Sequence, residues 1–200
     1  MKTLLSTTYF GPVQWYQKLY RSDEAEIEAC ESFQKQTYRN RCIIATTQGL
    51  QALTVPVERG VSPIIRDIRI SDHGNWRHLH WNALQCAYGE SPFFEYYQDD
   101  IRPFFDNRWD FLFDFNEAIM HKICELIDIL PKVSFSSEFR KDSETIKDYR
   151  EVIRPKTPPY DPDFEPKPYY QVYRQKHGFL PNLSVLDLLF NLGPESIFYL

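Results

Sequence analysis

Hydrophobic and polar residues alternate along the chain with two different periods, and the period predicts the type of element. Side chains of a strand point to opposite faces with period two, whereas those of a helix repeat after three or four residues. On this basis we predict strands at 3–10, 25–30, 41–46, 50–57 and 64–70, and a short strand at 133–139. The segment Thr47-Gln48-Gly49 has the composition of a tight turn, so the third and fourth strands should form a hairpin.

Helical spacing of apolar residues accounts for most of the remaining chain. Pro12 suits the first turn of a helix, because its missing N–H would have no partner there. The pattern predicts a helix that begins at Gly11-Pro12, a second that ends at Gly89, a third that begins at Ser91-Pro92 and a fourth that ends at Pro131. It also predicts a charged helix at 144–154. A nearly all-apolar helix follows at 185–192, with Ser184 as its N-cap and Gly193-Pro194 at its end.

Residues 155–168 carry six prolines, which exclude a helix or a central strand. We predict an extended strap over the surface, or a mobile tether. A helix as apolar as 185–192 must be buried, so the strap has to return the chain to the core. The whole pattern predicts one α/β domain over residues 1–200, three-layer-like, with a mixed β-sheet and flanking helices.

Composition indicates a folded protein and argues against some classes of function and location. The 200 residues are 42% hydrophobic and 16% aromatic, enough for a sizeable core, and the net charge of −5 argues against a protein that wraps nucleic acid. The four cysteines lack a CxxC pair, which indicates free thiols in a reducing compartment. No apolar run is long enough for a signal peptide or a membrane span, so we expect a cytoplasmic protein.

Cations gather in KQTYRNRCII, residues 35–44. If this segment is extended, one face carries Lys35, Thr37, Arg39 and Arg41, and the other carries Gln36, Tyr38, Asn40 and Cys42. Guanidinium groups match phosphate or carboxylate oxygens, and the helix that opens after Gly11-Pro12 adds free N–H groups. The row therefore predicts a small anion site. The alternative is that Arg39 and Arg41 pair with surface carboxylates such as Glu26, Glu28 or Glu31.

The histidines of DHGNWRHLHW invite a metal interpretation, which the spacing disfavours. His78 and His80 are two positions apart on the predicted helix and point to different sides, so we predict no metal site. His80 follows Trp76 by four residues, on the apolar stripe. It is either a hydrogen-bonded core residue or, in a partly buried cleft, a general base.

Other candidates have stronger structural interpretations. Asp187 lies three residues after Ser184, where it completes a capping-box-like arrangement. His177 falls in a predicted loop without a recognisable triad, and the Ser136-Ser137 pair lacks the glycines of a nucleophile elbow. Cys42 fits a buried strand thiol, and the aromatic residues of 93–115 fit the core better than a stacking platform.

Several long stretches resemble one family in the right order. They are LLSTTYFGPVQWYQKL (4–19), KQTYRNRCII (35–44), ALTVPVERG (52–60), HWNALQCAYGESPFFEYY (80–97), DYREVIRPK (148–156) and NLSVLDLLFNLGPES (182–196). These stretches resemble the WbqC-like proteins, in the form common in Bacteroides-type bacteria. Where that family often has Gln-Pro before the Tyr-containing turn, this chain has Thr7-Thr8, and Gly11 lies within the turn.

The resemblance implies a place in surface-polysaccharide synthesis, because such proteins are encoded among these genes, notably in O-antigen clusters. Some have been suggested to be glycine or aminoacyl transferases acting on sugars. We accordingly expect a transferase acting on a nucleotide-activated sugar or a sugar intermediate, or alternatively a non-catalytic ligand-binding or assembly protein. The expected site comprises Lys35, Arg39 and Arg41 on an anionic substrate, His80 as base, and Tyr9, Gln14 and Asn40 on sugar polar groups. The sequence identifies no cofactor and leaves a homodimer open.

Overall fold

The strand that opens the chain lies inside a parallel sheet. The computed structural model describes residues 2–58, 60, 62–141, 145–156 and 158–200. Its main sheet has the order β5-β2-β1-β6, with every neighbouring pair parallel. The strands are β1 (Lys2–Ser6), β2 (Glu24–Glu28), β5 (Val133–Phe135) and β6 (Ile146–Asp148). Adjacent Leu4 and Leu5 are both buried, as expected for a parallel sheet covered on both faces.

The predicted hairpin is confirmed. It consists of β3 (Arg41–Thr46) and β4 (Gly49–Thr54), which pair in antiparallel orientation and form a second sheet of their own. Gly49 lies at the turn with a φ of 106°, a conformation that favours glycine. The α/β class is confirmed, with parallel and antiparallel strands divided between two sheets.

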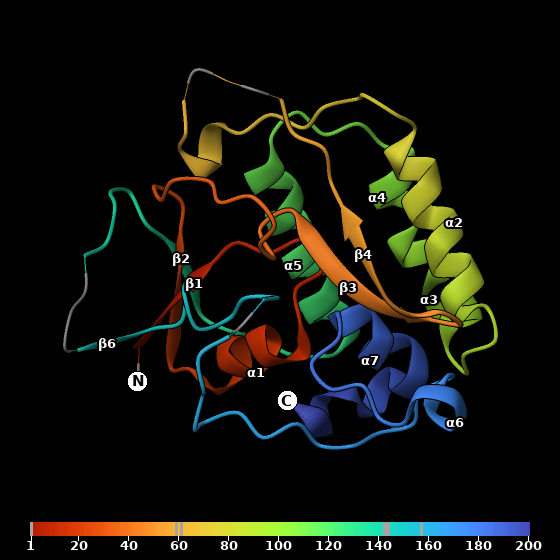
Figure 1. The fold of residues 1–200 in the computed structure, drawn as a ribbon. Coiled ribbons are helices and arrows are strands. Elements are labelled where there is room, and N and C mark those ends of the chain that lie inside the picture. Colours follow the sequence, from red (N-terminus) through yellow and green to blue (C-terminus); the bar gives the residue numbers. More distant parts are fainter. Residues whose placement is uncertain (1, 59, 61, 142–144, 157) are drawn as a thin grey trace.

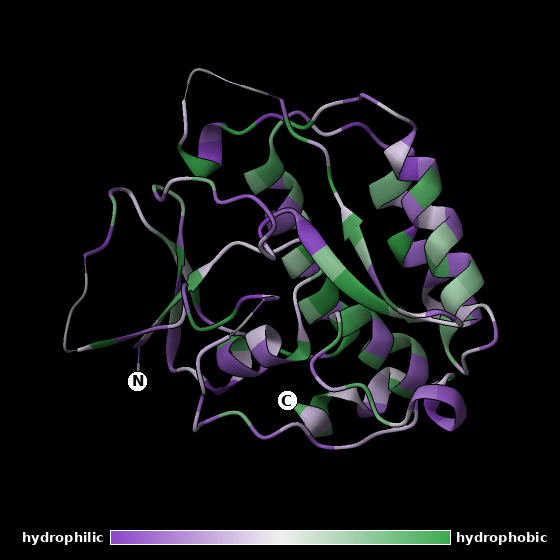
Figure 2. Cartoon of the chain, viewed as in Figure 1, coloured by the Kyte–Doolittle hydropathy of each residue, from purple (hydrophilic) through white to green (hydrophobic). Residues whose placement is uncertain are grey.

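Helices surround both sheets. They are α1 (Val13–Arg21), α2 (Trp76–Tyr88), α3 (Phe94–Ile101), α4 (Pro103–Asp106), α5 (Leu112–Leu126), α6 (Arg174–His177) and α7 (Val185–Leu192), with 3₁₀ turns at Ile65–Asp67 and Gly193–Tyr199. In Figure 1 the parallel sheet occupies one side of the molecule, α2, α3 and α4 occupy the other, and the hairpin crosses between them. Hydrophobic residues concentrate in α5 near the centre, whereas α6 is hydrophilic (Figure 2). Within the residues described, no helix is long and apolar enough to cross a membrane.

The buried C-terminal helix is also confirmed. Seven of the eight residues of α7 are buried, and Ser184 caps the helix by accepting a hydrogen bond from the N–H of Leu186. The capping-box prediction for Asp187 is wrong, because its carboxylate accepts hydrogen bonds from Tyr169 Oη (2.6 Å) and Gln171 Nε2 (2.9 Å) instead. The N–H of Ser184 donates to the Ile43 carbonyl, so α7 is joined to the hairpin.

Three predicted elements are wrong in kind or in length. Residues 64–70 form a 3₁₀ turn flanked by isolated bridges rather than a strand. The charged helix predicted at 144–154 contains β6, which pairs with β1; part of that prediction, 144, falls outside the described residues. The helix predicted to reach Leu130 ends at Leu126, and Leu130 is 97% exposed. In each case apolar spacing alone did not distinguish the competing conformations.

The strand predicted at 41–46 is confirmed, but the extended conformation on which the cation row depended does not hold for residues 35–40. Residues 35–40 form turns, and the strand begins only at Arg41. The alternation of side chains across a strand therefore does not apply to Lys35, Thr37 and Arg39. Lys35 is exposed and Arg39 is buried, so the four residues expected on one face do not share one.

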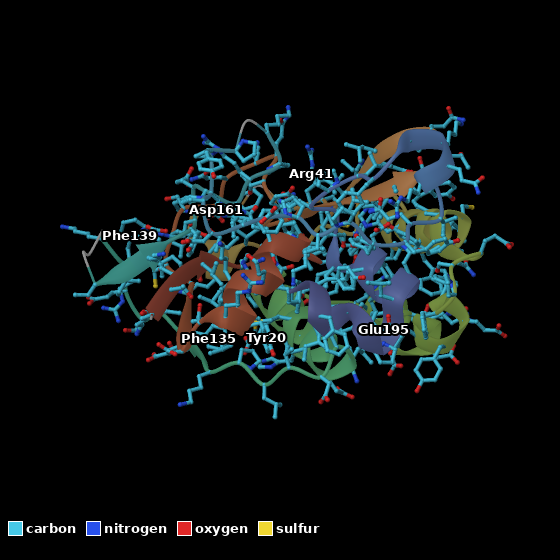
Figure 3. The ribbon with its side chains drawn as sticks, turned by 90° about the horizontal axis from the view of Figure 1, so that it is seen from below. Tyr20, Arg41, Phe135, Phe139, Asp161 and Glu195 are labelled. Atoms are coloured by element: carbon cyan, nitrogen blue, oxygen red, sulfur yellow. The ribbon has the colours of Figure 1, made fainter. Side chains whose placement is uncertain are left out.

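The proline-rich strap runs over the surface, as predicted. The described residues of 155–168 contain no helix or strand, and most of them are exposed. Asp161 is the exception, because its carboxylate binds Gln14 Nε2 and Lys18 Nζ of α1, each at 2.8 Å. Figure 3 shows Asp161 close to α1. The strap is thus attached to the first helix before it leads to α7.

Candidate functional site

The order of the parallel strands contains one reversal. The chain places β2 and then β5 on one side of β1, and returns to place β6 on its other side. Ligands of open parallel sheets bind outside the carboxyl ends of the strands, at such a reversal. The carboxyl ends of β1 and β6 are therefore the place where the fold favours a site. We call the residues around these carboxyl ends the sheet edge; the name does not refer to the outer strands of the sheet.

Arg39 reaches the sheet edge from the turns that precede β3. Its Nε and Nη2 donate to the two carboxylate oxygens of Glu31, at 2.8 and 2.5 Å, and Nη2 also donates to Ser6 Oγ at 2.8 Å. The Arg39 side chain is only 3% exposed. The ion-pair alternative is thus correct for Arg39, although Glu31 is buried rather than on the surface.

Arg150 brings a second guanidinium group to the same edge. It follows β6, donates to Asp148 Oδ2 at 2.6 Å through Nη2, and contacts Glu28 Oε2 at 3.2 Å through Nη1. Glu28, at the end of β2, is fully buried. Its carboxylate also accepts from Ser136 Oγ and from the N–H of Arg140, so β2, β6 and the segment that follows β5 contribute to this network. The strand ends are held together by paired charges.

Charge pairing offsets the effect of burial on the pKa of Glu26 and of Arg150. Burial raises the pKa of Glu26, but hydrogen bonds from Arg140 and Lys2 lower it below its ordinary value. Burial lowers the pKa of Arg150, and the opposing interactions with Asp148 and Glu28 raise it overall. Burial, together with Asp161 and Asp163, raises the pKa of Tyr149 to about 12. At neutral pH, Glu26 and Arg150 are therefore charged, and the Tyr149 hydroxyl stays protonated.

A cavity of about 280 Å³ opens beside this network. It is lined by Glu31, Ser32, Gln34, Phe139, Asp148, Arg150 and Glu151. Four of these residues are exposed: Glu151 and Phe139, with exposed fractions of 61% and 54%, and Ser32 and Gln34. Carboxylates and amides bind hydroxyl and amine groups, and an aromatic ring packs on the C–H face of a sugar. The cavity we call the edge cavity is chemically suited to a polar, hydroxylated or amino ligand.

Tyr9 and His80, which the sequence analysis placed in one site, do meet in the structure. Tyr9 Oη and His80 Nδ1 are 2.9 Å apart, and both side chains are buried. Burial lowers the pKa of His80 to about 4, and a hydrogen bond with the Thr54 backbone opposes that shift in part. His80 is therefore neutral at pH 7, and the prediction that it acts as a base stays a prediction.

The other predicted site residues lie in separate surroundings. Gln14 binds Asp161 and Asn182, and Arg41 donates through Nε to Thr54 Oγ1 at 2.9 Å. Asn40 Nδ2 donates to the Val55 carbonyl at 2.9 Å. Because Lys35 is exposed and Arg41 extends along the hairpin, the structure brings only Arg39 of the three predicted cations to the sheet edge.

Sequence reasoning missed Asp148 and Arg150. Both lie in the stretch DYREVIRPK, which was recognised as a family match but interpreted as part of a charged helix. The signal that was available is their spacing, because residues two apart share a face in extended chain. Among the residues described, no group of three or more His, Cys, Asp and Glu side chains is arranged to hold a metal ion.

Comparison with known proteins identifies the family. The model of the WbqC-like protein family matches residues 7–155. The chain belongs to the WbqC-like family. An uncharacterized protein of Mycobacterium tuberculosis (strain ATCC 25618 / H37Rv), Rv1507c, is 29% identical over 203 residues, which cover 89% of this chain and 87% of that protein. No solved structure matches the chain.

The matched region of this WbqC-like protein contains most of the sheet edge but not the last helix. Glu31, Arg39, Asp148 and Arg150 fall within 7–155, whereas α7 lies beyond it. Family membership suggests involvement in polysaccharide biosynthesis. Family membership does not identify the reaction, which we infer from the site.

Proposed function

We propose that this protein is a transferase of surface-polysaccharide synthesis that moves an acyl or aminoacyl group onto an amine or hydroxyl of a sugar, free or nucleotide-activated. The observation that carries the proposal is the edge cavity, where three carboxylates and an amide surround the space beside buried Arg39 and Arg150. Such a lining suits an amino sugar better than a phosphate, because the accessible charge at the cavity is mainly negative.

In the proposed reaction the sugar amine attacks the acyl carbon, a C–N bond forms, and the bond to the donor's leaving group breaks. The amine loses a proton, which Glu151 accepts. Glu151 is exposed and lines the cavity, and Gln34 Nε2 donates to its Oε1 at 2.9 Å, which orients the carboxylate. Positioning by Glu31 and Asp148 supplies the orientation on which such transfers depend. His80 as the base is the second version of this proposal.

The test is product detection by mass spectrometry. Purified protein is incubated with UDP-linked amino sugars and with acyl-coenzyme A or aminoacyl-tRNA donors. If Glu151 is the base, Glu151→Gln should lower the rate by about 100-fold, within the range of general acid–base catalysis. Glu125→Gln is the matched control, because Glu125 is an exposed carboxylate of α5 that does not line the edge cavity.

The same assay distinguishes the base. A loss confined to His80→Gln, with Glu151→Gln unaffected, would assign the proton to His80. Absence of product with every donor and acceptor would overturn the transferase proposal.

The second candidate is a non-catalytic binding or assembly protein. It is favoured by the internal pairing of Arg39 with Glu31 and of Arg150 with Asp148, which leaves both guanidinium groups with structural partners. An amino sugar bound at the edge cavity and recovered unchanged after long incubation would support this candidate.

A further inference from the structure

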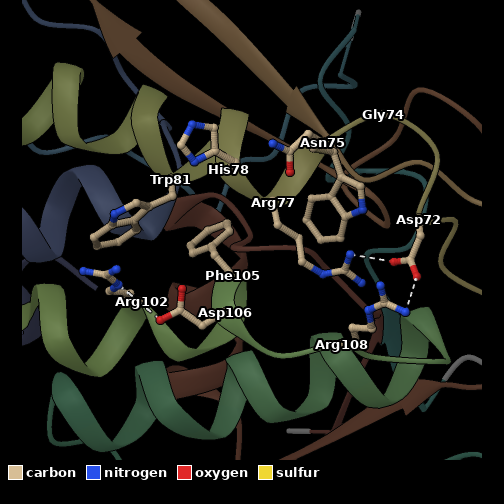
Figure 4. Close-up of a pocket in the computed structure, with 11 residues that line it drawn as sticks. Asp72, Gly74, Asn75, Arg77, His78, Trp81, Arg102, Phe105, Asp106 and Arg108 are labelled. Carbon is tan, nitrogen blue, oxygen red and sulfur yellow. Dashed lines mark hydrogen bonds and ion pairs between the residues drawn. The ribbon is translucent and has the colours of Figure 1, made fainter.

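A second cavity, of about 370 Å³, lies between the start of α2 and the short helix α4. Figure 4 shows three arginines around it: Arg77 from α2, Arg102 just before α4, and Arg108 two residues after α4. Trp81, Phe105 and His78 supply ring faces in the same lining. None of these residues belongs to the sheet edge. We call this space the arginine cavity.

The charges of the arginine cavity are unbalanced. Asp72 binds two of the guanidinium groups, through Arg77 Nη1 at 2.6 Å and Arg108 Nη1 at 3.3 Å. Asp106 binds Arg102 Nε at 3.1 Å. Three cations thus face two carboxylates, and the aspartates hold the guanidinium groups in place without neutralising all of them.

Two donors of Arg77, which lines the cavity, lack acceptors. Nε and Nη2 of Arg77 are buried without a hydrogen-bond partner among the described residues. A buried donor of a charged group without an acceptor is costly, and an anion would offset that cost. The N–H of Trp76, the first residue of α2, donates to the Gly74 carbonyl, but Asn75 makes no side-chain cap for the N–H groups that follow. Helix starts of this kind favour anions.

The aromatic walls add a second kind of contact. The Arg77 guanidinium lies over the Trp76 ring at 4.7 Å from its centroid, and Arg102 lies 5.9 Å from that of Trp81. Cations stacked on rings form a surface on which a flat, delocalised ring also packs. The volume falls within the range of small-molecule sites.

We propose that the arginine cavity binds a diphosphate ester that carries a planar ring, such as a nucleoside diphosphate. The phosphates would lie beside Arg77 and Arg108, which share Asp72, and the ring beside Trp81, Phe105 and Arg102 (Figure 4). This inference does not depend on transferase activity, because a protein that only retained such a ligand would use the same cavity.

Titration calorimetry with UDP, pyrophosphate and uridine tests the proposal. UDP should bind the wild-type protein, and the double variant Arg102→Gln/Arg108→Gln should weaken it by about 100-fold, roughly tenfold for each lost charged contact. These side chains are 56% and 83% exposed, so their replacement should preserve the fold, which circular dichroism verifies. Arg174→Gln is the matched control, because Arg174 is an exposed arginine of α6 that does not line the cavity.

Pyrophosphate should bind more weakly than UDP because it lacks the ring, and uridine should bind more weakly because it lacks the charge. Equal binding of UDP by wild type and double variant, or no binding of UDP at millimolar concentration, would overturn the proposal. Affinity for uridine or pyrophosphate equal to that for UDP would overturn it as well.

Discussion

At the sheet edge, the charged side chain of Arg39 is buried and therefore has to be paired. Burial of an ion costs several kcal/mol, which pairing and additional hydrogen bonds must offset. Arg39 meets that requirement with a bidentate contact to Glu31 and a third bond to Ser6. Removal of one partner of such a pair typically costs about 3–5 kcal/mol. Substitutions of Arg39 therefore test stability before they test function, and exposed Glu151 is the better probe of the proposed chemistry.

His80 gives a prediction for the dependence of stability on pH. The pKa of His80 is about 4 in the folded protein, because the side chain is buried, against about 6.5 for an unfolded histidine. Below pH 6.5 the unfolded state binds a proton that the folded state excludes. The stabilisation is therefore complete above pH 6.5 and is lost towards pH 4, by about 3 kcal/mol. Urea unfolding should show the free-energy difference between wild type and His80→Gln shrinking by that amount.

Asp187 is the matched comparison, with the opposite sign. Burial raises its pKa to about 6, so the folded state retains a proton that the unfolded carboxyl releases above about pH 4. Its stabilising contribution is present below pH 4 and is lost as pH rises to 6. Wild type should therefore gain stability relative to Asp187→Asn on acidification over that interval. Differences that do not change with pH would contradict both assignments.

Among the elements, the strap provides a prediction with an internal control. Asp161→Ala would leave the Lys18 ammonium, 5% exposed, without its carboxylate partner. Uncompensated buried charges of this kind cost about 3–5 kcal/mol. We expect a lower urea midpoint for this variant and faster proteolysis within residues 158–168.

The control lies two residues away in the same strap. Asp163 binds Lys147 Nζ at 2.6 Å, but both side chains are about half exposed. Solvent screens such a pair, so Asp163→Ala should have only a small effect. Equal destabilisation by the two substitutions would show that the strap is not attached through Asp161.

The elements that the sequence predicted correctly have strong local signals. The hairpin has its glycine turn, α1 follows Gly11-Pro12, and α7 has a serine cap before an apolar run. Residues 144–154 show the opposite situation. Charged residues at helical spacing indicate a helix, yet Ile146 to Asp148 complete the sheet by pairing with β1, a contact with residues more than 140 positions earlier. Pairing over such distances leaves no local pattern.

The site was predictable to a similar, partial extent. Arg39 and its partner Glu31 were both named from the sequence, because an arginine in a cation-rich segment needs an anion. The cavities were not predictable, since each combines side chains from separate elements. Arg77 is next to His78 in the sequence, but only the packing of α4 against α2 brings Arg102 and Arg108 to the same cavity.

At the scale of the whole molecule, the contacts of α7 indicate how much of the chain has to fold together. The match to the family model ends at residue 155. Helix α7 follows that point in the sequence, yet it packs against α1, α3 and β3, which lie within the matched region. The N–H of Val13 donates to the Leu183 carbonyl, and that of Phe93 to the Phe190 carbonyl. Because these contacts join both sides of the molecule, we propose that residues 1–200 unfold as one cooperative unit.

A fragment of residues 1–155 tests that proposal. Val185, Leu186, Leu188, Leu189 and Phe190 have no exposed surface, and each contributes about 1.5–3 kcal/mol on burial. Their loss, roughly 7–15 kcal/mol by the same scale, equals the whole stability of a typical domain. The fragment should show no cooperative transition in urea, and addition of a 161–200 segment should restore one. A sharp transition of the fragment alone would instead establish that the family-matched region folds independently, with the strap and α7 as an appendage.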